Sequence, residues 1–131
     1  AGPGEMKHTG FDLKQHLLFG DLTALPVISV ILEKLSPNAI GNAYIQVPSE
    51  KDIQSINAPE GVTINWLITS NKKTEGFIEG LMAQATDLRD TAIFIANEAS
   101  IVKQLKTYLN ESCHFNKNSL YASAYWNEKR N

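Results

Sequence analysis

The chain has 131 residues, 43% of them hydrophobic and 20% charged, with a formal net charge of −2. These values are typical of a single globular domain, and they exclude sequence-independent nucleic-acid binding, which needs a concentrated basic surface. No apolar run approaches the ~20 residues of a membrane-spanning helix, so membrane insertion is not expected.

Short apolar segments alternate along the chain with segments of helical spacing. The apolar segments predict five buried strands, at residues 16–19, 43–47, 62–68, 91–96 and 120–126. Apolar residues at i, i+3, i+4 and i+7 predict three helices, whose stripes include Ile31, Leu81 and Leu105. A helical turn is expected at residues 52–56. This alternation predicts a three-layer α/β/α fold, a five-stranded parallel sheet with helices on both faces.

The ends of the predicted helices carry typical capping residues. Thr23 is expected to cap the first helix, with Pro26 in the first turn, where a missing N–H costs little. Thr74 and Asn97 are expected to cap the second and third helices. Gly80 is expected to weaken the second helix by about 1 kcal/mol relative to alanine.

In an open parallel sheet, ligands bind beyond the carboxyl ends of the strands, near the point where strand order reverses. This rule selects residues 20–26, 48–52, 69–74, 97–100 and 125–131. Residues 20–26 give the strongest indication, because a helix N-terminus offers N–H groups and a positive dipole end to a dinucleotide pyrophosphate. They match neither G-x-G-x-x-G nor the P-loop pattern, so an ordinary strand–helix turn is the alternative.

Several polar residues follow the other strands. Lys72 and Lys73 are candidates for the 2′-phosphate of NADPH, and a solvated turn is the alternative. Ser49 and Lys51 are weaker candidates for the same role. Glu98 is expected either to polarise a bound nicotinamide amide or to stabilise its own helix.

The histidines and the cysteine predict no metal site. His8, His16 and His114 lie far apart and have no metal-ligand spacing, so structural or surface roles are expected. Cys113 is the single cysteine and excludes an internal disulfide, which predicts the reducing cytoplasm as the compartment. It follows a helix, and nothing in the sequence lowers its pKa.

Five segments, in order, resemble motifs of the siderophore-interacting protein family. Residues 16–26, HLLFGDLTALP, are similar to the signature LLxGDxTALPA. Residues 52–67 contain a stretch similar to D-x-Q…P-x-G-V-x-V-x-W-L. ANEA at 96–99 and SAYW at 123–126 resemble the family's AGEA turn and terminal SGYW strand, and Gly2-Pro3 resembles the GP that opens this half of the family's proteins.

This resemblance implies a ferredoxin-reductase-like nucleotide-binding fold. It identifies residues 1–131 as the C-terminal NAD(P)H-binding domain of an oxidoreductase, a flavin-dependent ferric-siderophore reductase. The family's N-terminal FAD-binding barrel is absent from this sequence, so the chain alone is expected to be incomplete. Its expected partners are that barrel and a ferric siderophore, which loses its iron when Fe(III) is reduced to Fe(II).

The resemblance also assigns roles to residues at matching positions. The residues implied to line the pyrophosphate and nicotinamide are Gly20, Asp21, Thr23, Ala24 and Pro26. Those implied to lie beside the nicotinamide ribose are Asn97, Glu98 and Ala99. The implied catalytic residues are Glu98, Tyr125 and Trp126, with the aromatic pair near the flavin edge. An ordinary core role for Tyr125 and Trp126 is the alternative.

Departures from the family pattern leave some choices open. Thr69 stands where the family often has arginine, which leaves NADH against NADPH undecided, and Asn97 replaces the AGEA glycine. Two other functions stay open: a non-catalytic nucleotide-binding or regulatory module, and a flavin reductase with another acceptor. A receiver-type regulator needs paired acidic residues after the first strand, where Asp21 is the single acidic residue. Against a flavin reductase with another acceptor, Trp66 and the GDxTALP turn favour the siderophore branch.

Overall fold

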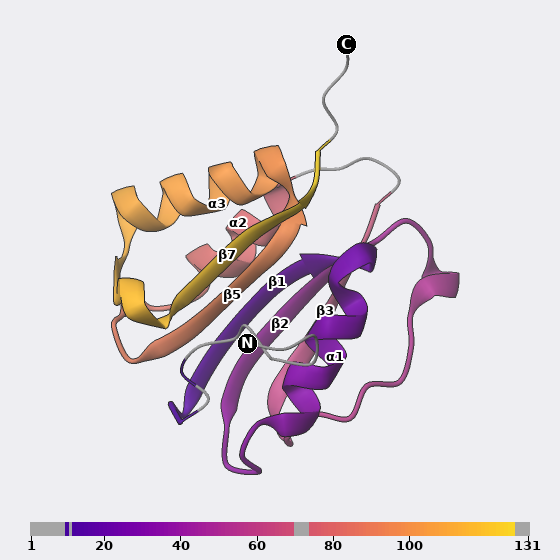
Figure 1. Cartoon of the computed structure of the whole chain (residues 1–131), viewed down its shortest axis with the longest axis horizontal. Helices are drawn as coiled ribbons and strands as arrows, with labels where there is room; N and C mark the ends of the chain where they lie inside the picture. The colour runs from indigo at the N-terminus through magenta and orange to yellow at the C-terminus, as the bar shows by residue number, and fades with distance from the viewer. Residues whose placement is uncertain (1–9, 11, 70–73, 128–131) are drawn as a thin grey trace, which may run out of the picture.

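The computed structural model describes residues 10, 12–69 and 74–127 (Figure 1). Its centre is a five-stranded sheet in which every pairing is parallel and the order is β3-β2-β1-β5-β7. The strands are β1 (Gln15–Asp21), β2 (Ile40–Val47), β3 (Gly61–Ile68), β5 (Thr91–Glu98) and β7 (Leu120–Trp126). The predicted five-stranded parallel sheet is therefore confirmed.

Helices cover both faces of this sheet, as predicted (Figure 1). The helix α1 (Leu25–Lys34) packs on one face, and α2 (Glu75–Met82) and α3 (Ala99–Ser112) pack on the other. Three short 3₁₀ helices lie in the connections: η1 (Leu22–Ala24), η2 (Glu50–Asp52) and η3 (Lys117–Ser119). None of the helices within the described residues is long and apolar enough to span a membrane.

The central strands are apolar on consecutive residues because they are buried on both sides. In β1, Leu18 belongs to the core cluster under α1, whereas Leu17 and Phe19 belong to the cluster under α2 and α3. The same alternation holds in β5, where Phe94 faces α1 and Ile95 faces the opposite layer. The sheet therefore has a separate hydrophobic core on each of its two faces.

Some local predictions were wrong. The helical turn expected at residues 52–56 is η2, which lies earlier because the Ser49 side chain accepts a hydrogen bond from Lys51 N and starts the turn there. A second, two-stranded sheet of β4 (Asp87–Leu88) and β6 (His114–Phe115) was not predicted. Two residues are too few to show a periodic pattern.

The predicted helix caps also need correction. Thr23 does not cap α1, because the chain first forms η1, which Asp21 caps, and α1 begins after Ala24. Thr74 occupies the N-cap position of α2, but its side chain makes no capping hydrogen bond within the described residues. Asn97 lies inside β5, and Glu98 caps α3 in its place. Pro26 does lie in the first turn of α1, as predicted.

Gly80 has a packing role that its helix propensity does not show. A Cβ at this position would lie 2.6 Å from Cζ of Tyr44. The bare backbone of α2 therefore lets the Tyr44 ring lie against it, where that ring stacks on Phe19 with centroids 5.4 Å apart. The helix-propensity cost at Gly80 is offset by close helix–sheet packing.

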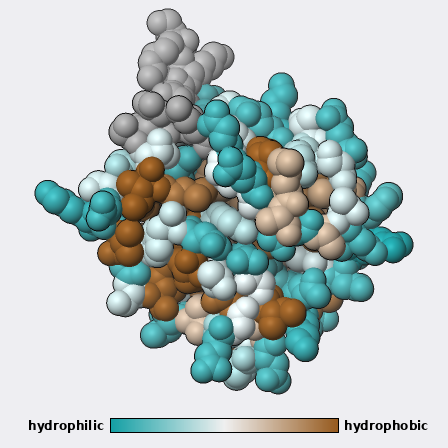
Figure 2. All heavy atoms as spheres, turned by 180° about the vertical axis from the view of Figure 1, so that it is seen from behind, coloured by the Kyte–Doolittle hydropathy of each residue, from teal (hydrophilic) through white to brown (hydrophobic). Residues whose placement is uncertain are grey.

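The outer surface mixes apolar and polar side chains. Figure 2 shows apolar side chains gathered on one side of the rear face and mostly polar ones elsewhere. The large hydrophobic residues that are exposed come from different elements: Leu22, Val30, Ile40, Ile53, Ile68 and Met82. Exposed hydrophobic residues are common on globular proteins.

His16 is a buried structural residue. Its side chain is fully buried, and Nε2 donates a hydrogen bond to the Leu13 carbonyl over 2.8 Å. Burial is the main reason why its pKa lies below the ordinary value of 6.5. The unfolded chain therefore takes up this proton near pH 6.5, whereas the folded chain takes it up only at a lower pH.

We expect this difference to lower the stability in mild acid. The free energy of unfolding should be unaffected by His16 above pH 6.5 and should fall as the pH drops below it, by at most about 1.4 kcal/mol per pH unit. Urea denaturation between pH 7.5 and pH 5.5 measures this slope. The slope should shrink in His16→Gln and persist in a variant of the exposed His114, His114→Gln. Equal slopes in His16→Gln and the unaltered chain would show that His16 does not cause the loss of stability in mild acid.

Candidate functional site

The strand order reverses between β1 and β5, at the carboxyl edge of the sheet. From β1 the chain crosses to β2 on one side, and it later returns to β5 on the other side of β1. Gly20 pairs with Ala96, so the segments that follow, residues 20–26 and 97–100, lie next to each other. This is the point at which open parallel sheets bind ligands, and the sequence predicted both segments.

Asp21 is the centre of a hydrogen-bond network at this edge. Its side chain is 8% exposed. Oδ1 accepts hydrogen bonds from the Thr23 backbone N–H (3.0 Å) and from the Thr23 hydroxyl (2.5 Å). Oδ2 accepts one from the Trp126 indole Nε1–H over 2.7 Å. The carboxylate thus ties its own turn to a residue 105 positions away.

A register shift at the end of β7 brings Trp126 to this position. Ala124 pairs with Asn97 and Trp126 pairs with Glu98, so Tyr125 is an extra residue with no counterpart in β5. Such bulges re-aim the side chains that follow them. Because β5 lies between β1 and β7, the hydrogen bond to Asp21 carries the indole across the end of β5.

Glu98 serves as the N-cap of α3, which was one of the two roles expected for it. Its side chain is 3% exposed. Oε1 accepts hydrogen bonds from the Ser100 backbone N–H (3.0 Å) and from the Ser100 hydroxyl (2.5 Å). The role in polarising a nicotinamide stays a prediction.

Asn97 is fully buried beside these two carboxylates. Its Oδ1 accepts a hydrogen bond from the Glu98 backbone N–H over 2.7 Å. Its Nδ2 has no hydrogen-bond partner among the described residues. A buried donor left in this state costs roughly 1–3 kcal/mol, so a partner such as a bound ligand or a water molecule would stabilise it. The sequence suggested Asn97 as a helix cap and as a residue beside the nicotinamide ribose, but it did not indicate that this side chain is buried with an unpartnered donor.

The other predicted residues of the first turn divide into buried and exposed ones. Gly20 lies beneath α1, where a Cβ would stand 2.5 Å from Ile28 Cδ1, and Ala24 is fully buried. Thr23 and Pro26 are exposed at the edge. Gly20 and Ala24 therefore contribute to the packing beneath this turn. Thr23 and Pro26, which are exposed, are accessible to a ligand.

The remaining candidates are placed less centrally. Tyr125 is half-buried against the α1 core cluster, and burial raises the pKa of its phenol. Ser49 is used within η2, and Lys51 is exposed there. Ala99 is half-buried at the start of α3. Lys72 and Lys73 lie outside the described residues. The site therefore gathers residues from β1, β5 and β7.

Cys113, His16 and His114 form no nucleophilic or metal-binding group among the described residues, and His8 lies outside them. Burial raises the pKa of the Cys113 thiol, so the thiol is a weak nucleophile at neutral pH. Among the described residues, no three His, Cys, Asp or Glu side chains group together as metal ligands would.

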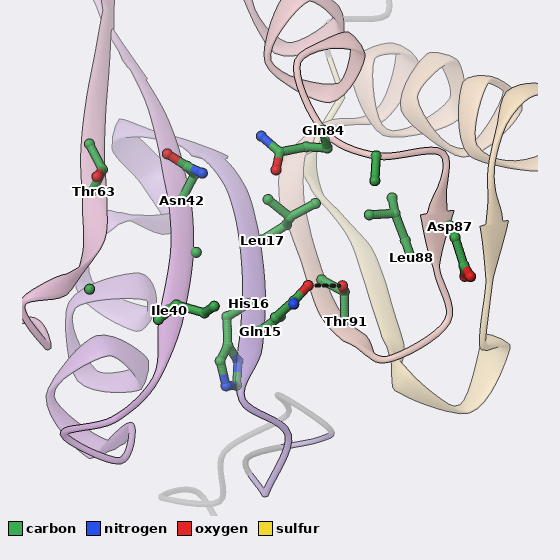
Figure 3. A pocket seen from close by; sticks show the side chains of 13 residues that line it. Gln15, His16, Leu17, Ile40, Asn42, Thr63, Gln84, Asp87, Leu88 and Thr91 are labelled. Carbon is green, nitrogen blue, oxygen red and sulfur yellow. Dashed lines mark hydrogen bonds between the residues drawn. The ribbon is translucent and has the colours of Figure 1, made fainter.

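A cavity of about 440 Å³ lies at the opposite, amino edge of the sheet (Figure 3). Uncharged polar side chains line much of it: Gln15, Asn42, Thr63, Gln84 and Thr91. It is open because α2, eight residues long, spans about 12 Å while the eight-residue strand β2 spans about 26 Å. The polar lining is what a half-covered sheet face requires, and the cavity is separate from the carboxyl edge.

Comparison with known proteins gives a consistent result. The family model described as "Siderophore-interacting protein" matches residues 13–129. The chain is 28% identical over 119 residues to the ferric vibriobactin reductase ViuB of Vibrio cholerae, covering 88% of this chain and 44% of that protein. It is 32% identical over 127 residues to the uncharacterized protein Rv2895c of Mycobacterium tuberculosis, covering 88% of this chain and 45% of that protein. The chain thus spans a little less than half the length of these relatives.

Solved structures share the fold. The siderophore-interacting protein SipS from Aeromonas hydrophila superposes with a TM-score of 0.82 at 25% identity, over 91% of this chain and 48% of that one. A siderophore utilization protein from T. fusca superposes with a TM-score of 0.78 at 23% identity, over 91% and 47%, and this likeness concerns the fold alone.

Proposed function

Because the chain belongs to the siderophore-interacting protein family, we propose that it is the NAD(P)H-binding domain of a flavin-dependent ferric-siderophore reductase. The observation that carries this proposal is the meeting of Asp21, Asn97, Glu98 and Trp126 at the switch point of a parallel sheet. Ligands of open parallel sheets bind at that point, and a few placed polar groups beside an aromatic ring are typical of small-molecule sites.

The hydrogen bonds at this edge support the nicotinamide riboside as the group bound there. The Thr23 and Ser100 hydroxyls donate their protons to Asp21 and Glu98, so each has lone pairs left with which to accept a hydrogen bond. The amide and ribose hydroxyls of a nicotinamide nucleoside are suitable donors. Asn97 Nδ2 adds a buried donor beneath the same edge.

The phosphates suit this edge less well. The Thr23 N–H is already bonded to Asp21, and Pro26 has no N–H to offer. Two buried carboxylates would also repel a pyrophosphate. We therefore propose that the phosphates lie away from Asp21 and Glu98, and that Lys72 and Lys73 remain candidates for a 2′-phosphate.

In the whole protein, we propose an N-terminal FAD-binding domain as the partner of this domain and a ferric siderophore as the substrate. When bound, the nicotinamide and flavin coenzymes would supply the electrons that convert Fe(III) to Fe(II). A siderophore built for the harder Fe(III) holds Fe(II) weakly, so iron is released. The reducing cytoplasm is the compartment that fits this role.

A nucleotide titration followed by backbone amide NMR tests the proposal. We expect NADPH or NADH to shift the amides of residues 21–27 and 97–101, with weak, saturable binding. Amides around the amino-edge cavity, such as those of Gln15 and Thr91, serve as the internal control and should not move. Tighter binding of NADPH than of NADH would indicate that Lys72 or Lys73 meets the 2′-phosphate.

Two results would contradict this assignment. One is saturable shifts centred on the amino-edge cavity instead of the carboxyl edge. The other is an absence of shifts at millimolar nucleotide in this chain and also in a protein that joins it to a flavin domain.

A further inference from the structure

We infer that Asp21 is a positioning residue whose carboxylate latches the Trp126 indole across the end of β5, and that it acts on a ligand through Trp126. The functional part of this inference rests on the proposed function, while the latch itself does not. The resemblance to the family motif implied that Asp21 lines the ligand. Its hydrogen bonds to Thr23 and Trp126 instead indicate that its carboxylate holds other parts of the protein in place.

The Asp21 carboxylate is committed inside the protein. It is nearly buried, and its two oxygens accept hydrogen bonds of 2.5–3.0 Å from two donors of Thr23 in its own turn and from the Trp126 indole 105 positions away. Hydrogen bonds to a charged acceptor are shorter and stronger than those between neutral groups. Three of the roughly four lone pairs of this carboxylate are occupied and the side chain is buried, so a ligand has little access to Asp21 directly.

Trp126 needs such a restraint because of where it lies. It is the last residue of β7, and β7 is the outer strand next to β5. The pairing there is already irregular, since the register shifts between Asn97 and Glu98. Strand ends of this kind fray readily. The bond to Asp21 joins this end directly to β1, the middle strand of the sheet.

The latch therefore sets the orientation of an aromatic ring at the switch point. An indole held by its Nε1–H keeps one defined plane, and an aromatic plane is what a nicotinamide or flavin ring stacks against. Its effect on binding is pre-organisation: a ring that is already oriented loses less freedom when the ligand arrives. Asp21 and Trp126 should then act on binding as one unit.

The first measurement concerns the protein without nucleotide. The chain has two tryptophans, Trp66 and Trp126, and Trp126→Phe assigns their indole N–H resonances. We expect Asp21→Asn to speed hydrogen exchange at the Trp126 Nε1–H by about tenfold, while Trp66 does not change. Thr23→Val is the matched control, because it removes another donor to the same carboxylate and should leave the Trp126 indole protected. An unchanged Trp126 exchange rate in a folded Asp21→Asn protein would overturn the latch.

The second measurement concerns nucleotide affinity in the same variants. We expect Asp21→Asn and Trp126→Phe each to weaken binding several-fold, and the double variant to be no weaker than either one. Additive losses, or a loss in Asp21→Asn with none in Trp126→Phe, would mean that Asp21 meets the ligand directly and would overturn its positioning role. If the unaltered chain binds no nucleotide even when joined to a flavin domain, the proposed function fails, while the exchange rates still decide whether the latch exists.

Discussion

Replacing Gly41 by alanine is expected to cost about 4 kcal/mol or more of folding free energy, enough to unfold much of a domain whose total stability is about 5–15 kcal/mol. Gly41 has φ +147°, a conformation that is essentially restricted to glycine. A Cβ there would lie 1.8 Å from the His16 carbonyl oxygen, its partner across β1 and β2. The clash is with backbone, so β1 and β2 would have to separate.

Urea denaturation followed by tryptophan fluorescence measures this loss. Gly76→Ala is the matched control, because the new Cβ would lie 3.0 Å from Cδ1 of the Leu67 side chain, which can move. Alanine is also favoured over glycine in a helix by about 1 kcal/mol, so Gly76→Ala should change the stability little. A Gly41→Ala protein with the same urea midpoint as the unaltered chain would show that β2 does not have this backbone geometry.

Phe19→Ala is expected to lower the free energy of unfolding by about 3–5 kcal/mol. Phe19 is fully buried, stacks on Tyr44 with ring centroids 5.4 Å apart, and meets Phe77 edge-on at 6.1 Å. These three rings join β1, β2 and α2 beneath the turn that carries Asp21. Truncation would leave a cavity among rigid rings that cannot collapse into it.

Two further variants make this second prediction sharper. Phe19→Leu keeps most of the volume and should cost clearly less than Phe19→Ala. Leu22→Ala alters a partly exposed residue on the neighbouring η1 and should stay within about 0.5 kcal/mol of the unaltered chain. Equal losses for Phe19→Ala and Leu22→Ala would contradict the assignment of Phe19 to the core.

The arrangement of helices on both faces of a sheet could be predicted from the sequence, because burial determines the spacing of apolar residues along each element. Strands such as β1 and β5 are apolar on consecutive residues because helices cover both of their faces, and amphipathic stripes marked α1 and α3. The rule for ligand sites in parallel sheets then selected residues 20–26 and 97–100. Both segments do lie together at the switch point.

The helix starts were predicted less well, because a cap depends on how one strand ends. Thr23 and Asn97 are suitable capping residues by type. The chain instead leaves β1 through the 3₁₀ turn η1, and β5 continues through Asn97, so the carboxylates of Asp21 and Glu98 accept the first N–H groups. A difference of one or two residues in strand length decides which side chain is the cap.

The sequence by itself determined the α/β class, the parallel sheet and the resemblance to the siderophore-interacting protein family, and it predicted the edge at which a ligand is expected to bind. Each of these depends on local composition or on motifs within one segment. Tertiary structure alone decided that Asp21 holds Trp126 and that Asn97 is buried with an amide nitrogen that has no hydrogen-bond partner among the described residues. The physical reason is distance along the chain. A hydrogen bond between residues 105 positions apart depends on strand order and on the register shift at Asn97–Glu98, and neither leaves a periodic signal in the sequence.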